Sequence, residues 1–193
     1  MKPVISITFD DGNVNCHAEA FSILKNYGLR GSFYITTEQV GAPGKMDWKQ
    51  VGELYDAGHE IGSHTHTHPL LTTLDDDLLE MELSKSKELL KAFNPRTIAY
   101  PCGDYDEHVI NAAKKYYEAG RCFAETGPGS PNLLPFKNPF ALSNTSLDGY
   151  SGIGQDREKK EWIIFVFHLY GRMTLPQVWW GITHGRFKWS TVQ

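Results

Sequence analysis

The sequence predicts an α/β fold, more specifically a distorted or incomplete (β/α) barrel with about seven parallel strands. Segments with strand patterns alternate with segments with helix patterns along the chain, which favours parallel strands joined by helical crossovers, in an open sheet or a barrel. Seven strands are expected, and that number favours the incomplete barrel. The length suits one domain with a sizeable core, and no repeat or linker indicates a second one, so we expect a single domain over residues 1–193.

Seven short runs rich in β-branched and aromatic residues are expected to be strands. The first, VISITF, is followed by two aspartates, and the last, EWIIFVFH, ends in a histidine. In chain order the expected strands cover residues 4–9, 30–36, 59–64, 97–101, 121–126, 140–147 and 161–168. Residues 127–140 contain four prolines and no periodicity, so they are expected to form a long loop.

Four segments that place apolar residues on one face are expected to be helices. They cover residues 16–27, 47–58, 75–93 and 106–120. Asp47 and Asp106 are expected to cap the N-termini of the second and fourth helices. Gly28, Gly58 and Gly120 are expected to end the first, second and fourth. The Glu and Lys side chains of the longest helix are interpreted as a solvated face without a function.

The composition excludes several classes of protein. The formal net charge is -4, so no broad attraction to nucleic acid or to an anionic membrane is expected. No apolar run approaches the ~20 residues that span a bilayer. There is no leader pattern at the N-terminus, which predicts either a cytoplasmic protein or one whose leader was removed, and the localisation stays unknown. Three cysteines without CxxC spacing make a disulfide framework unexpected.

Acids and histidines recur at the positions where the expected strands end. In α/β folds the active site lies at the C-terminal ends of the parallel strands. Asp10 and Asp11 follow the first strand, HTHTH follows the third, PCGDYD follows the fourth, and His168 ends the last. This coincidence indicates a polar site at one end of the fold. A lone histidine at the end of an apolar strand is more often a core residue, so the case for His168 rests on its position.

The histidines of HTHTH have two possible geometries. On a strand, all three would point to one face. In a loop or helical turn, His64 and His68 would share a face at i and i+4, and His66 would point away. Two histidines and one aspartate satisfy a catalytic zinc ion, which keeps one position open. The alternative is a polar loop whose histidines bond only to backbone.

The adjacent acids of TFDD are expected to do different jobs. Neighbouring side chains on an extended chain point to opposite sides, so one of Asp10 and Asp11 can bind a metal while the other stays free as a base. The alternative is a turn in which an aspartate bonds to the backbone and caps the following helix.

Four motifs in this order resemble the polysaccharide deacetylases, the NodB-homology domain proteins of carbohydrate esterase family 4. They are TFDDG, HTHTH, the YPCG turn and a late strand that ends in histidine, and they extend over nearly the whole chain. The resemblance implies a distorted seven-stranded (β/α) barrel and a metal-dependent enzyme, usually with zinc. Such enzymes remove acetyl groups from N-acetylglucosamine polymers or from O-acetylated xylan, and they are usually secreted or located at the cell envelope.

The resemblance assigns roles to the residues of the first two motifs. It implies that Asp10 is the catalytic base and that Asp11 is a metal ligand. His64 and His68 would be the other two ligands, and Thr65 would brace the loop between them. The implied cofactor is therefore a divalent metal ion, with zinc as the first expectation.

The later motifs match less closely. The resemblance implies that His168 is the catalytic acid and that the backbone N–H of Cys102, where the family usually has Tyr, helps to bind the oxyanion. Ala99 and Asn144 stand where the family commonly has arginines, one of which orients the base. Arg121 could substitute, or it could be an ordinary surface charge.

The expected function is metal-dependent removal of acetyl groups from poly- or oligosaccharides that contain N-acetylglucosamine, with a metal-activated water, an Asp base and a His acid. The alternatives are deacetylation of O-acetylated xylan, hydrolysis of a non-sugar amide on the same scaffold, and a non-catalytic carbohydrate-binding relative. The expected partner is an acetylated saccharide. Neither a nucleic acid nor a membrane-spanning segment is expected, and the oligomeric state stays open.

Overall fold

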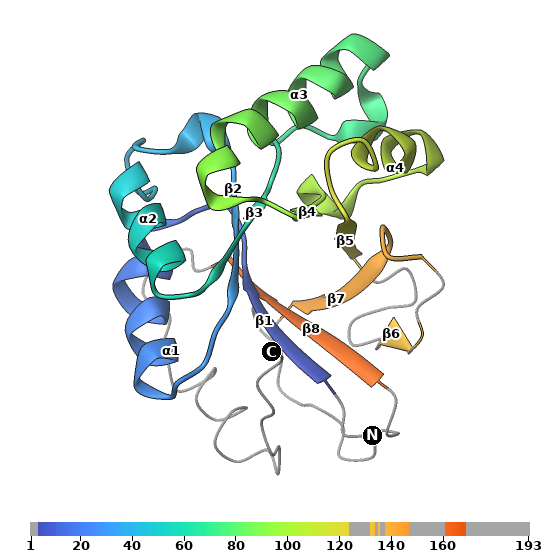
Figure 1. Cartoon of the computed structure of the whole chain (residues 1–193). Coiled ribbons are helices and arrows are strands. Elements are labelled where there is room, and N and C mark those ends of the chain that lie inside the picture. The colour runs from blue at the N-terminus through green and yellow to red at the C-terminus, as the bar shows by residue number, and fades with distance from the viewer. Residues whose placement is uncertain (1–3, 124–131, 134, 136–137, 147–160, 169–193) are drawn as a thin grey trace.

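A ring of seven parallel strands forms the centre of the computed structural model, with four α-helices packed around it (Figure 1). The structure describes residues 4–123, 132–133, 135, 138–146 and 161–168. The strand order is β1-β2-β3-β4-β5-β7-β8, and β8 also pairs with β1. This arrangement confirms the predicted distorted barrel.

The described strands are short, with two to seven residues each. Their bounds are β1 (Val4–Phe9), β2 (Ser32–Ile35), β3 (Glu60–Ser63), β4 (Thr97–Ala99), β5 (Ala119–Phe123), β6 (Asn132–Leu133), β7 (Leu142–Ser146) and β8 (Glu161–Phe167). Among the described strands only β6 is antiparallel, and it pairs with the first two residues of β8.

The helices alternate with the strands, as the sequence predicts. The α-helices are α1 (Ser22–Asn26), α2 (Trp48–Asp56), α3 (Asp76–Leu89) and α4 (Glu107–Ala113). The shorter helical segments are η1 (Cys16–Phe21), η2 (Thr37–Gln39), η3 (Leu71–Thr73), η4 (Lys91–Phe93) and η5 (Pro101–Gly103). Asp47 and Asp106 cap α2 and α4 through hydrogen bonds from the backbone amides of Gln50 and Val109, at 2.8 Å each.

The pairing of β1 with β8 closes the ring and brings distant parts of the chain together. Six residue pairs join them, from Val4↔Trp162 to Phe9↔Phe167. Because the strands are parallel, the residues that follow them, Asp10 and His168, leave the barrel at the same end. The ring closure therefore positions one half of the site described below.

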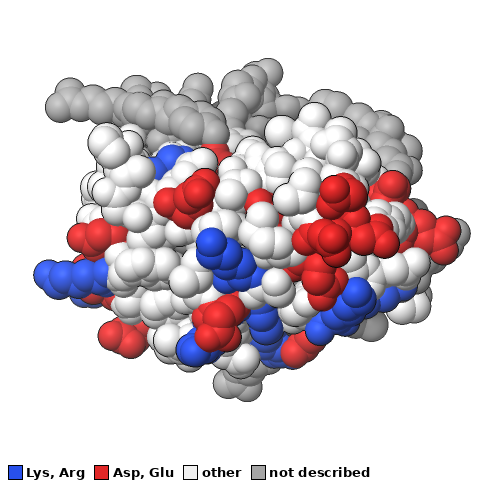
Figure 2. All heavy atoms as spheres, turned by 90° about the horizontal axis from the view of Figure 1, so that it is seen from above, with Lys and Arg blue, Asp and Glu red and all other residues white. Residues whose placement is uncertain are grey.

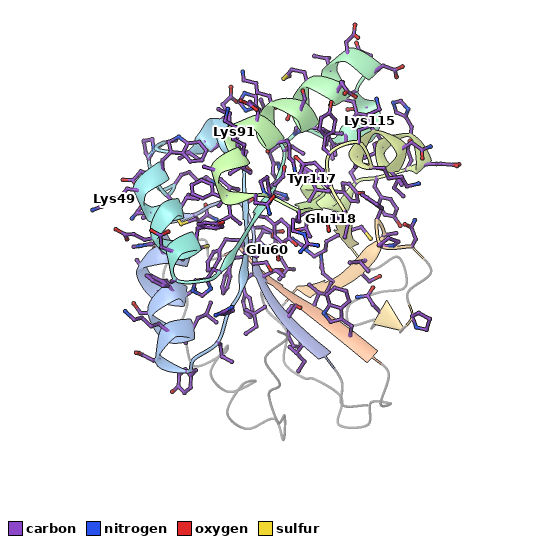
Figure 3. The ribbon with its side chains drawn as sticks, viewed as in Figure 1. Lys49, Glu60, Lys91, Lys115, Tyr117 and Glu118 are labelled. Carbon is purple, nitrogen blue, oxygen red and sulfur yellow. The ribbon has the colours of Figure 1, made fainter. Side chains whose placement is uncertain are left out.

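Two hydrophobic clusters hold the helices against the barrel. In the first, Phe9 stacks on Phe33 and on Phe167, with ring centroids 4.7 and 5.5 Å apart. In the second, Leu83 of α3 packs with residues of β4 and α4. Tyr117 belongs to this cluster and lies beside α3 (Figure 3), where its hydroxyl donates to the Leu83 carbonyl at 3.1 Å. Burying a side chain of leucine or phenylalanine size contributes about 1.5–3 kcal/mol, so these clusters anchor α3 firmly.

One predicted boundary is wrong. The sequence predicts a helix over residues 106–120 that ends at Gly120, but α4 ends at Ala113 and Gly120 lies inside β5. The glycine is required by packing instead, since a Cβ atom there would lie 2.3 Å from the hydroxyl oxygen of Tyr100. The predicted long loop at 127–140 lies largely outside the described residues, and its described part includes β6.

The charged side chains and the cysteines are arranged as follows. Lys, Arg, Asp and Glu side chains are interspersed on the face that carries the helices (Figure 2). No disulfide joins any two of the three cysteines. Within the described ranges, none of the helices has the length and apolar character needed to cross a membrane.

Candidate active site

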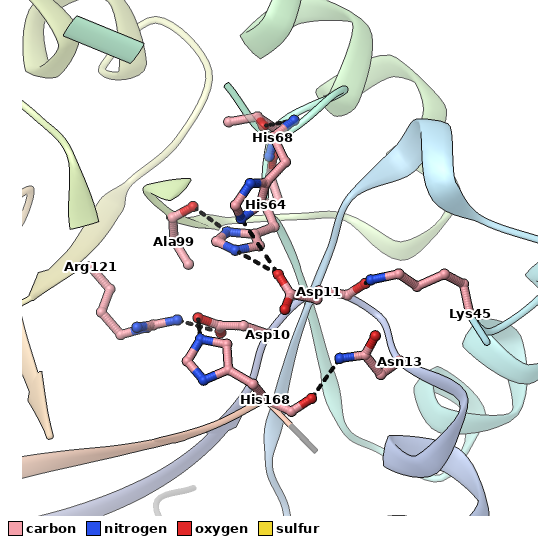
Figure 4. Close-up of polar contacts among 11 residues, drawn as sticks. Asp10, Asp11, Asn13, Lys45, His64, His68, Ala99, Arg121 and His168 are labelled. Carbon is pink, nitrogen blue, oxygen red and sulfur yellow. Dashed lines mark hydrogen bonds and ion pairs between the residues drawn. The ribbon is translucent and has the colours of Figure 1, made fainter. Parts of the chain in front are cut away.

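The histidine loop, residues 64–68, follows β3 and turns instead of continuing the strand. His64 and His68 both point their Nε2 atoms at Asp11, with distances to its Oδ1 of 3.4 and 3.5 Å (Figure 4). His66 points away, and its Nδ1 lies 2.9 Å from the hydroxyl of Thr37. The structure thus has the turn geometry in which the first and last histidines share a face.

The hydrogen bond of His64 fixes which of its ring nitrogens can bind a metal. Its Nδ1 lies 2.7 Å from the backbone carbonyl of Ala99, and since a carbonyl only accepts, Nδ1 must carry the proton. In the neutral ring Nε2 then has a lone pair, which points at an oxygen of Asp11. Two acceptors that face each other are stabilised by a cation between them. The ligand atoms of Asp11, His64 and His68 lie within 4.8 Å of one another, so the donor set fits a divalent metal ion.

The surroundings of His68 favour the neutral imidazole that a metal ligand needs. Burial lowers the pKa of its imidazole, and the nearby His64 lowers it further. A metal binds the neutral ring, so this environment favours ligation over protonation.

The second half of the site contains Asp10, Arg121 and His168. Asp10 and Arg121 are each only 4% exposed, and a terminal nitrogen of the guanidinium donates to Asp10 Oδ1. The other carboxylate oxygen lies 3.9 Å from Nε2 of His168. Arg121 also lies over the ring of Tyr34, with its Cζ 5.0 Å from the ring centroid. It is therefore a buried partner of Asp10 and not a surface charge.

The two adjacent acids have different partners (Figure 4): Asp11 faces the histidine loop, and Asp10 faces Arg121 and His168. The amide of Asp10 still donates to the carbonyl of Phe167, at 3.0 Å, as a continuation of the β1–β8 pairing. Asp11 then adopts a left-handed φ of 67°, which turns its side chain toward the histidine loop. The ammonium of Lys45 donates to the backbone carbonyl of Asp11 at 3.0 Å. The side-chain amide of Asn13 donates to the backbone carbonyl of His168 at 2.6 Å.

Unusual backbone geometry is concentrated here. Five described residues other than glycine have positive φ, and four of them belong to predicted site segments: Asp11, Thr65, His68 and Cys102. The fifth, Asn94, ends helix η4, a position where this conformation is ordinary. Each such residue costs of the order of 1–3 kcal/mol, and such strain is typically kept where it serves function.

Three further residues that the sequence analysis singled out are described: Thr65, Cys102 and Asn144. Thr65 accepts a hydrogen bond from the amide of His68, at 3.1 Å from its hydroxyl oxygen, which fixes the turn of the loop. Cys102 is exposed and lies in the η5 turn directly after β4, with φ of 55°. Asn144, which stands where the family commonly has an arginine, is buried. Its Oδ1 has no hydrogen-bond partner within the described part of the chain.

One residue of the site was missed by sequence reasoning. Glu82 of α3 was placed on a solvated face, but it is buried and accepts hydrogen bonds from the histidine loop. Leu79 and Leu83 form the inward face of α3. Glu82 lies three residues after Leu79 and directly before Leu83, so the helical period places it on that same inward face. A buried acid inside an apolar stripe is the signal that could have identified it.

The comparisons with known proteins agree on one family. The family model described as polysaccharide deacetylase matches residues 1–117, which is more than half of the chain. YxkH of Bacillus subtilis, a protein named for this family, is 32% identical over 130 residues, covering 65% of this chain and 46% of the relative. The peptidoglycan-N-acetylmuramic acid deacetylase PdaA of the same organism is 31% identical over 119 residues, covering 59% and 44%.

A solved structure extends the likeness to the fold. BC0361, a polysaccharide deacetylase from Bacillus cereus, matches with a TM-score of 0.64 at 27% identity, covering 72% of this chain and 46% of that one. In all three comparisons the chain spans just under half the length of the protein that it matches.

Proposed function

The chain belongs to the polysaccharide deacetylase family, and on that premise we propose that it is a metal-dependent hydrolase that removes acetyl groups from poly- or oligosaccharides containing N-acetylglucosamine. One observation carries the proposal. Three potential metal ligands, Asp11, His64 and His68, converge beside a second buried acid that is paired with arginine. This arrangement supplies an electrophilic centre and a separate base in one place.

Asp11, His64 and His68 would hold the metal ion. Three protein ligands leave a coordination position open, and a divalent ion bound there would supply the Lewis acidity that activates water and polarises an acyl oxygen. The protein's own part is to direct both Nε2 atoms at one point, and the Ala99 carbonyl orients the ring of His64 by accepting from its Nδ1.

Asp10 is the proposed base. It accepts the proton from water as the water oxygen bonds to the acetamide carbon. The hydrogen bond from Arg121 to one carboxylate oxygen orients the group. The other oxygen remains directed toward the side where His168 lies.

His168 is the proposed acid. An amide nitrogen is a poor leaving group until it is protonated, so cleavage of the C–N bond requires a proton donor on that nitrogen. The sugar amine departs with this proton, and the acyl group becomes acetate. The backbone N–H of Cys102 is proposed to donate to the developing oxyanion.

The test is acetate release from N-acetylglucosamine oligomers by the whole chain. Protein stripped of metal with a chelator should be inactive, and added zinc should restore activity. Asp10→Asn should lower turnover by about 100- to 10,000-fold, the usual contribution of a general base, while the zinc content is unchanged.

The matched control is Asp56→Asn, which makes the same chemical change at an exposed position at the end of α2. It should release acetate at the wild-type rate. Release that does not require metal, or full activity in Asp10→Asn, would contradict the proposal. Release only from acetylated xylan or from a non-sugar amide would move the substrate assignment, and zinc binding without any release would favour a binding role.

A further inference from the structure

The histidine loop cannot satisfy its backbone through regular secondary structure. Thr65 and His68 have left-handed φ of 65° and 71°, so the chain between them is neither helix nor strand. On one side, the carbonyls of Thr65 and His66 accept from the amides of Thr37 and Glu38, at 3.2 and 2.9 Å. The loop is buried, and buried backbone amides need partners, so the amides of residues 66 and 67 must be satisfied by another element.

Glu82 provides those partners from α3. Its Oε2 accepts hydrogen bonds from the amides of His66 and Thr67, both at 2.8 Å. Its Oε1 accepts from the hydroxyl of Thr67 at 2.6 Å. The side chain is only 2% exposed. Hydrogen bonds to a carboxylate are about twice as strong as neutral ones, and burial strengthens them further.

A second residue on the same face of α3 supports the other end of the loop. Ser86, one helical turn after Glu82, lies 2.8 Å from Ser63, oxygen to oxygen. The Ser63 hydroxyl in turn accepts from the amide of Thr65 at 3.1 Å. Leu83, between the two, is fully buried. The inward face of α3 therefore contacts the loop at two points and is itself held by the second hydrophobic cluster.

We propose that Glu82 is a positioning residue for the metal site, a role that rests on the metal site of the proposed function. It fixes the backbone of residues 66 and 67, which lie between the ligands His64 and His68. A rotation there would move one imidazole relative to the other, and metal sites accept ligand distances within only about 0.2 Å. Glu82 thus acts through the loop backbone and sets the geometry of the ligands.

The experiment measures zinc affinity of the folded chain by competition with a chelator. Glu82→Ala removes all three hydrogen bonds and should raise the zinc dissociation constant by about 10- to 100-fold, the usual cost of losing a partner that orients a ligand. Glu82→Gln keeps one oxygen for the two amides and should raise it by about 3- to 10-fold, because neutral hydrogen bonds are weaker. Thermal unfolding of the metal-free forms, recorded in parallel, confirms that each variant is folded at the temperature of the titration.

The control is Glu88→Ala on the same helix, where the side chain is exposed and paired with Lys91. Its dissociation constant should stay within about twofold of wild type. A purely structural role for Glu82 would lower the unfolding temperature and leave the affinity of the folded protein unchanged. A folded Glu82→Ala within about twofold of wild type would overturn the proposal. If Glu82→Ala shows no cooperative thermal unfolding, the test uses Glu82→Gln instead, and a zinc dissociation constant within about twofold of wild type would again overturn the proposal.

These outcomes are separate from those of the activity test. A graded loss of affinity from Gln to Ala in a chain that releases no acetate would support this inference and count against the proposed activity. Unchanged affinity in an active chain would overturn only the role of Glu82. A wild-type chain that binds no zinc would overturn both the metal site and this inference.

Discussion

The two halves of the site are built in different ways. The metal half takes its three ligands from one residue after β1 and one five-residue loop, and its geometry is set by local turns with left-handed residues. The acid–base half takes Asp10, Arg121 and His168 from three strands, and the first two are 111 residues apart in sequence. The pairing of β1, β2 and β3 thus brings the candidate metal ligands together and local turns orient them, whereas closure of the barrel brings the proposed acid and base together.

This difference implies that the halves can be damaged separately. Substitutions in the metal half should remove both metal and turnover. Substitutions in the acid–base half should remove turnover and leave the metal in place. The following experiments test that separation.

The largest effect is expected from the metal half. His64→Ala removes a ligand, so zinc binding and acetate release should both fall, the latter by about 1,000-fold or more, since metal catalysis contributes several kcal/mol. Zinc titration and acetate release measure the two effects. Turnover that is lost while zinc affinity is unchanged would contradict the assignment of His64 as a ligand.

A selective effect is expected from His168→Asn. Release from an N-acetyl substrate should fall by roughly 100- to 1,000-fold, because the departing amine loses its proton donor. Release from an ester of comparable size should fall less, since an alcohol leaves more readily. Rates on the paired substrates, measured at saturating zinc, test this. An equal loss on amide and ester would remove the case for His168 as the acid.

Arg121→Lys should have a smaller effect. The lysine keeps the positive charge beside Asp10 but loses the planar guanidinium with its several hydrogen-bond donors in fixed directions. The proposed base is then less well oriented. Turnover should fall by roughly 10- to 100-fold, as expected for a misplaced catalytic group. Zinc affinity should stay at the wild-type value. Wild-type turnover in a folded Arg121→Lys would show that orientation by the guanidinium is unnecessary.

The smallest effect is expected from His66→Gln. This side chain points out of the metal site toward Thr37, and glutamine can keep that hydrogen bond. The zinc dissociation constant should stay within about twofold of wild type, as for a substitution that removes no major interaction. A zinc titration beside His64→Ala checks this contrast. Loss of zinc in His66→Gln would mean that the histidine loop binds metal in another geometry.

The same contrast explains what could be predicted from the sequence. The alternation of strands and helices up to β5, the helix caps at Asp47 and Asp106, and the i, i+4 placement of His64 and His68 depend on short spacings, and the structure has them all. The end of α4 was mispredicted, because Gly120 is required by the nearby Tyr100 and not by a helix terminus.

The sequence alone did not show whether Arg121 lies beside Asp10. Its position depends on the register of β5 within the ring, and no local pattern records that register. Glu82 is a different case, because its place in the leucine stripe of α3 is visible in the printed sequence once burial is considered. The prediction for Arg121 was therefore limited by strand pairing over a long sequence distance. The prediction for Glu82 was limited by the assumption that a charged side chain on a helix faces solvent.

The pairing of β1 with β8 also has a consequence for the order of events during synthesis. β8 is synthesised more than 150 residues after its neighbour β1. Contacts between such distant segments form late and slow folding. Until β8 docks, one edge of β1 lacks its strand partner and Asp10 lacks His168 beside it. The nascent chain can therefore bring Asp11, His64 and His68 together before Asp10 meets His168, and the proposed hydrolysis must wait for β8.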